Sequence, residues 1–79
     1  MRIMSPDEIQ AALLPLDITV LEAKRVSRHP EDAHLYYILA KRNEEFVTWL
    51  YNDHDKGCYN GKYSYDFLKA AEMYDARGN

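Results

Sequence analysis

The chain has little of what small proteins use for covalent or metal-based stabilisation. Its 79 residues include one cysteine, Cys58, so no disulfide can form within the chain. A lone thiol is typical of a reducing compartment, and no apolar stretch follows Met1 as it would in a signal peptide. The sequence therefore predicts a cytoplasmic protein. Because there are no linkers, repeats or low-complexity tracts, we expect one domain over residues 1–79.

Long apolar runs and glycine-rich motifs are also missing. No stretch reaches the roughly 18 apolar residues of a membrane-spanning helix, so we expect no contact with a membrane. With only three glycines, neither G-x-x-x-x-G-K-[ST] nor G-x-G-x-x-G occurs. These absences exclude the nucleotide-binding loops of both types and the enzyme classes that depend on them.

A basic surface is lacking too. The net charge is −3, and the acidic excess lies in residues 43–79, because acids and bases balance in residues 1–42. Proteins that bind nucleic acid need a basic stripe to neutralise phosphates. The only dense basic segment is 24–28, and Glu31 and Asp32 follow it directly. The charge therefore favours a protein partner over nucleic acid.

What the sequence does contain includes two clear helix signals. Residues 5–8, Ser-Pro-Asp-Glu, form a capping box in which Ser5 and Glu8 satisfy each other's backbone N–H groups. Pro15 ends this helix near Leu14. Asp66 can cap a second helix, whose apolar face consists of Phe67, Ala70, Ala71, Met73 and Tyr74.

Three segments between the helices favour strands. Residues 18–26, 35–40 and 46–51 are rich in β-branched or aromatic side chains, which suit a pleated surface. The last two flank the short polar link 41–45 and so predict a β-hairpin. The apolar residues of 35–50 also fall near helical spacing, and one long helix is the alternative.

A further strand is predicted after the polar turn cluster 52–57. Tyr59, Tyr63 and Tyr65 alternate with polar residues, which places them on one face of a half-buried edge strand. Gly61 indicates a bulge or a close backbone approach within it.

These elements predict an α+β fold in the order helix, three or four antiparallel strands, helix. We expect both helices on one face of the sheet. The strands at 35–40 and 46–51 are apolar on both faces, whereas an antiparallel sheet with one solvated face alternates apolar and polar residues. Two short helices on one face would leave an aromatic face for a partner protein or a second copy of the chain.

Residues with catalytic or metal-binding chemistry are few and poorly spaced. Asp53, His54, Asp55 and Cys58 share one polar turn, but zinc sites need three or four ligands in paired arrangements. Adjacency of a cysteine and a histidine does not supply the lowered pKa or the oriented base of a nucleophile. The sequence therefore predicts no enzyme, no metal and no cofactor.

The resulting hypothesis is a small interaction module that binds a protein partner. Large rigid aromatic side chains carry interface energy at low entropic cost. Acidic side chains on the rim would steer a partner during encounter. The aromatic anchors predicted are Tyr36, Trp49, Tyr51, Tyr59 and Tyr63, and the steering charges are Glu44, Glu45, Asp53 and Asp55.

A compact acidic domain without catalytic motifs suits a stoichiometric inhibitor or adaptor. A phage- or plasmid-encoded antagonist of host machinery, such as an anti-CRISPR-type protein, is one version, by analogy alone. The alternative is a homodimeric nucleic-acid-binding or regulatory protein whose uncovered sheet face pairs with its own copy.

Overall fold

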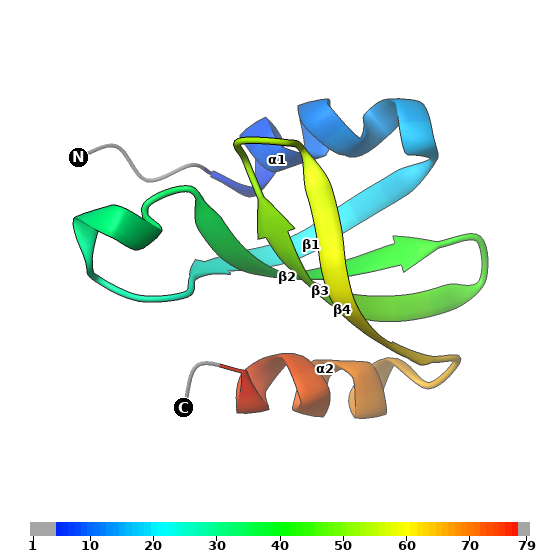
Figure 1. Ribbon diagram of the computed structural model, residues 1–79. Coiled ribbons are helices and arrows are strands. Elements are labelled where there is room, and N and C mark those ends of the chain that lie inside the picture. Colours follow the sequence, from blue (N-terminus) through cyan, green and yellow to red (C-terminus); the bar gives the residue numbers. More distant parts are fainter. Residues whose placement is uncertain (1–4, 78–79) are drawn as a thin grey trace.

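A four-stranded antiparallel sheet with the order β1-β2-β3-β4 forms the centre of the described chain. The structure is a computed structural model that describes residues 5–77 (Figure 1). The predicted order of helix, antiparallel strands and helix is confirmed, with four strands in this part of the chain. The elements are α1 (Pro6–Leu13), η1 (Leu14–Leu16), β1 (Ile18–Arg25), η2 (Pro30–Asp32), β2 (Leu35–Arg42), β3 (Glu45–Asn52), β4 (Gly57–Ser64) and α2 (Phe67–Ala76).

Both helices begin at the caps that the sequence predicts. The Ser5 hydroxyl accepts from the backbone N–H of Glu8, and the Glu8 carboxylate accepts from the N–H of Ser5. The Asp66 carboxylate accepts from the N–H of Leu68 at the start of α2. These local hydrogen bonds satisfy donors that would otherwise be orphaned at the helix N-termini.

The β2–β3 hairpin is confirmed, and the alternative of one long helix is wrong. The strands pair in regular register, from Leu35 opposite Asn52 to Arg42 opposite Glu45. Only two residues connect them, and Asn43 has a φ of 57°, which asparagine tolerates better than most residues. The β-branched and aromatic side chains therefore outweighed the approximate helical spacing.

The two helices cover opposite faces of the sheet. On the first face, Ile9 and Leu13 of α1 share a core with alternate residues of the central strands, namely Tyr36, Ile38, Ala40, Val47, Trp49 and Tyr51. On the second face, Ala70 and Tyr74 of α2 pack with Leu39, and Tyr37 and Phe46 lie against them. Figure 1 shows the sheet between the two helices.

The prediction that both helices share one face is therefore wrong. The apolar character of both faces of β2 and β3, read correctly from the sequence, is the physical reason. Each face needs cover, and one helix on each side provides it at the least exposure of apolar surface. No wholly uncovered sheet face remains for a partner within the described chain.

A bulge in β4 changes which side chains share a face. Thr48 pairs with Lys62 and Leu50 pairs with Tyr59, so two residues of β4 oppose Trp49 alone. Asn60 in this bulge has a φ of 55°. The bulge predicted at Gly61 is thus present, but it reverses the side-chain alternation.

Tyr59 and Tyr63 consequently lie on opposite faces of the sheet. Tyr63 pairs with Val47 on the α1 face, whereas Tyr59 pairs with Leu50 on the α2 face. The expected common face is wrong, because one inserted residue shifts a period-two pattern by half a period.

Two side chains satisfy backbone groups that strand pairing leaves open. The Gln10 amide donates to the carbonyl of Ile18 at 2.7 Å and accepts from the N–H of Val20 at 2.6 Å, along the outer edge of β1. The Arg77 guanidinium donates to the carbonyls of Thr48 and Asn60, beside the bulge. Neither role is visible in the sequence, since both partners are distant along the chain.

We expect Gln10→Ala to lower the free energy of unfolding by on the order of 1 kcal/mol, because it leaves two part-buried backbone groups without partners. Urea denaturation would measure the loss. Ala11→Ser, at an exposed position of the same helix, is the matched control. Equal stability of the two variants would contradict this role of Gln10.

Candidate binding surface

Strand register divides the sheet into two chemically different ends. We call one the Asn43 end: it contains the start of β1, the β2–β3 turn and the end of β4. We call the other the His54 end: it contains the end of β1, the start of β2 and the β3–β4 turn. Large exposed apolar side chains gather at or next to the Asn43 end, namely Leu14, Leu16, Tyr63, Tyr65, Phe67 and Leu68.

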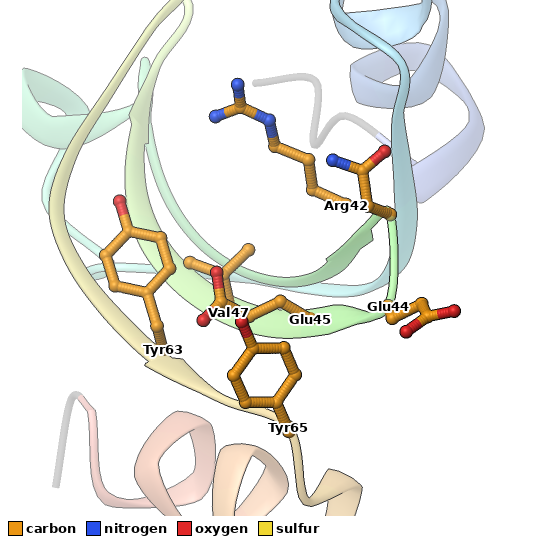
Figure 2. Close-up of a pocket in the computed structure, with 7 residues that line it drawn as sticks. Arg42, Glu44, Glu45, Val47, Tyr63 and Tyr65 are labelled. Carbon is orange, nitrogen blue, oxygen red and sulfur yellow. The ribbon is translucent and has the colours of Figure 1, made fainter.

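A pocket of about 570 Å³ opens at the Asn43 end. It lies on the α1 face of the sheet, but over β3 and β4, whereas α1 itself packs on β1. Figure 2 shows Val47 on its floor and Tyr63 and Tyr65 along one wall. Its lining residues are Arg42, Asn43, Glu44, Glu45, Val47, Tyr63 and Tyr65.

Tyr63 is held in place from below. The indole Nε1 of Trp49 donates to its hydroxyl at 3.3 Å, and the two rings meet edge to face with centroids 6.1 Å apart. Trp49 is itself buried in the core. Tyr63 is therefore half exposed but oriented, which lowers the entropic cost of a contact with a partner.

The charged residues of the pocket take different directions. In Figure 2 the Arg42 side chain reaches across the mouth, the Glu45 side chain runs toward the tyrosines, and Glu44 points away from the pocket. Within residues 5–77, the side chains of Arg42, Glu44 and Glu45 make no hydrogen bond or ion pair. These side chains are free to pair with an incoming group.

The predicted aromatic anchors fall into two groups. Tyr36, Trp49 and Tyr51 are at most 5% exposed and belong to the core between the sheet and α1. Their burial is a correction to their assignment as anchors, since a side chain inside the fold cannot contact a partner directly. Tyr59 and Tyr63 remain about half exposed, at opposite ends and on opposite faces of the sheet.

The predicted steering charges also separate. Glu44 and Glu45 lie at the Asn43 end, whereas Asp53 and Asp55 lie in the β3–β4 turn at the His54 end. Asp53 accepts from the Tyr51 hydroxyl at 3.0 Å and forms an ion pair with Lys56. Asp55 accepts from the N–H of Gly57 at 2.8 Å and from the Tyr59 hydroxyl. These two carboxylates hold the turn together.

The electrostatics of the turn agree with this role. Burial opposes ionisation of Asp53, but the hydrogen bonds from Lys56 and Tyr51 outweigh it and hold its pKa below the usual value. The hydrogen bonds from Tyr59 and the Gly57 N–H lower the pKa of Asp55. Both carboxylates are therefore stabilised as anions by the folded chain.

Cys58 and His54 do not form a nucleophile and base. Burial, and secondarily the charge of Asp55, raises the pKa of the Cys58 thiol to about 11, so it stays protonated at neutral pH. Cys58 packs against the core, and the ring of His54 instead stacks on His34 at 3.8 Å. Among residues 5–77, no group of three or more potential ligands is placed to hold a metal ion.

Sequence reasoning missed Tyr65, Arg42 and Leu68 as surface candidates. Tyr65 is 77% exposed and Leu68 is 69% exposed. The residue types of Tyr65 and Leu68 gave no signal, because tyrosine and leucine are more typical of the core, and Arg42 was one charge of the polar link 41–45. Their exposure at or next to the Asn43 end follows only from the tertiary arrangement.

Comparisons with known proteins add no relative: no family model, no curated protein and no solved structure matches the chain. None of the helices within residues 5–77 is long and apolar enough to cross a membrane.

Acid should destabilise the chain partly through the β3–β4 turn. Because the pKa values of Asp53 and Asp55 are lower in the folded chain, the unfolded chain binds protons first as the pH falls. Their stabilising contribution is complete above the unfolded pKa of about 4 and is lost as the pH falls through the folded pKa. We expect the free energy of unfolding to fall less between neutral and acid pH in Asp53→Asn than in the parent chain. Urea unfolding at the two pH values measures this fall.

The control for this experiment is Glu44→Gln, which removes an exposed carboxylate that makes no hydrogen bond within the described chain. It should keep the parent's acid sensitivity. An unchanged pH dependence in Asp53→Asn would show that the turn does not depend on this carboxylate.

Proposed function

We propose that this chain is a non-enzymatic interaction module that binds a protein partner through its Asn43 end, as a stoichiometric inhibitor or adaptor. The observation that carries the proposal is the gathering of exposed apolar side chains at that end, two of which, Tyr63 and Tyr65, line a pocket. Exposed apolar patches rimmed by polar residues mark interaction sites on small proteins.

Burial of these side chains would supply the free energy of association. Tyr65 and Leu68 are more than two-thirds exposed, and Phe67, stacked edge to face on Phe46 at 5.2 Å, presents part of its ring to solvent. Burying apolar surface contributes roughly 25 cal/mol per Å². Tyrosine adds a hydroxyl that can bond with the partner, and its two side-chain torsions cost little entropy to fix.

The His54 end supports the proposal by contrast. The polar groups of its β3–β4 turn bond with one another: Asp53 with Lys56, and Asp55 with Tyr59. A surface whose charges are already paired gains less from a partner, because those pairs must be desolvated or broken. The Asn43 end offers exposed apolar groups together with charges that pair with none of the residues 5–77.

Glu44 and Glu45 would raise the rate of encounter with a basic partner surface. Long-range attraction between complementary charges increases association rates and weakens with salt. The free acids of the Asn43 end and the net charge of −3 both favour such a partner.

A photoreactive p-benzoylphenylalanine at position 65 should cross-link to a protein in a nuclease-treated extract, and one at position 59 should not. Both replace exposed tyrosines at opposite ends of the sheet, and the change at position 59 also removes the hydroxyl that bonds with Asp55. Mass spectrometry of the adducts identifies the partner. Equal cross-linking at both positions, or adducts with nucleic acid or the chain's own copies alone, would contradict the proposal.

With that partner in hand, Tyr65→Ala and Leu68→Ala should each weaken binding by about 1–3 kcal/mol, as truncation of an exposed anchor does. Their high exposure predicts little change in the free energy of unfolding. Titration calorimetry measures the affinity, and Tyr59→Ala is the matched control. A loss of affinity equal to that of the control would show that Tyr65 and Leu68 do not lie in the interface.

A further inference from the structure

We propose that the pocket at the Asn43 end receives an arginine side chain of the protein partner, seated between Glu45 and the rings of Tyr63 and Tyr65. This inference rests on the proposed function and adds the chemistry that the partner must present. It follows from the shape, the aromatic wall and the charge of the pocket.

The pocket suits an inserted group rather than a flat surface, and it is large enough for a long side chain. A volume of about 570 Å³ lies within the range of roughly 300–1,000 Å³ found for small-ligand pockets. Val47 closes the floor from within the core, so the methylene stem of an inserted side chain would lie against the exposed parts of the Tyr63 and Tyr65 rings. A deep guest therefore keeps apolar contact while its head group meets the polar walls.

The aromatic wall favours a cation. The face of a tyrosine ring carries partial negative charge, so it attracts a guanidinium and repels a carboxylate. Tyr63 is fixed by Trp49, and Tyr65 follows it at the next position on the same face of the chain. Arginine is preferred to lysine here, because its planar head group can stack on a ring and still donate hydrogen bonds.

Glu45 supplies the matching charge. Its side chain is half-buried, runs into the pocket and has no counter-ion among the described residues. A partly desolvated carboxylate without a partner is costly, and a guanidinium can bond with both of its oxygens. The guest would therefore complete an ion pair that the folded chain leaves open.

Arg42 limits where the guest can lie. Its side chain reaches across the mouth on the side away from the tyrosines, so like-charge repulsion directs an incoming arginine toward Glu45. The competing outcome is an acidic guest paired with Arg42. The two tyrosine rings and the Glu45 carboxylate oppose that guest, so the structure favours the basic one.

The test is an amide chemical-shift titration of the isotope-labelled full chain with acetyl-Gly-Arg-Gly-amide. Saturable shifts should centre on Val47, Tyr63 and Tyr65. The citrulline peptide, which keeps the shape of arginine without its charge, should cause none. Glu45→Gln should raise the dissociation constant of the arginine peptide about tenfold or more, because a charge-assisted hydrogen bond is lost.

Glu72→Gln is the matched control, since it removes an exposed carboxylate of α2, the helix that covers the opposite face of the sheet. The dissociation constant of the arginine peptide should stay within about twofold of the parent value, because a distant exposed charge contributes little. Equal losses in both variants would reduce the effect to general electrostatic attraction and overturn the inference. Absence of shifts, or stronger binding of acetyl-Gly-Glu-Gly-amide at the same residues, would also overturn it.

These outcomes are separable from failure of the proposed function. If the residue at position 65 cross-links to a protein partner but the arginine peptide causes no shifts, the interaction module stands and only its arginine pocket is wrong. If the peptide binds and no partner cross-links, the pocket is a cation site without the proposed protein interface.

Discussion

The constraint on which this fold depends is the apolar character of both faces of the β2–β3 hairpin. The consecutive residues Ile38 and Leu39 point to opposite faces and are both almost completely buried, so neither face of the hairpin can be left to water. Two helices at opposite ends of the chain satisfy this constraint by packing on opposite faces. Each helix is short, however, and covers only part of its face. On the α1 face, the part above β3 and β4 is left as a pocket.

The bulge at Asn60 and Gly61 determines what lines that pocket. It turns Tyr63 and Tyr65 toward the α1 face and Tyr59 toward the other. It also brings Gly61 against Trp49, where a Cβ at position 61 would lie 2.7 Å from the indole nitrogen. Glycine is thus required by the close approach rather than by its backbone torsion. The Trp49–Tyr63 contact that results joins the core directly to the candidate binding surface.

The two ends of the sheet divide structural and binding roles. At the His54 end, carboxylates, tyrosines and Lys56 bond within the turn, and their polar surface is already satisfied. At the Asn43 end, exposed apolar groups surround charges that have no partners within the described chain. In a chain this small, a surface that does not help the fold is where a binding function can be placed without loss of stability.

The sequence alone determined the local structure: the capping box at Ser5, the end of α1 near Pro15, the hairpin, and the bulge at Gly61. These features depend on neighbours a few residues apart, so residue type is sufficient to predict them. Only the tertiary structure decided which helix covers which face, and that Tyr36, Trp49 and Tyr51 are core whereas Tyr63 and Tyr65 face the pocket. The same residue type serves both purposes, and strand register together with helix placement, set by contacts far apart in the chain, determines which one applies. The same long-range contacts made Asp53 a turn residue and left Glu45 open.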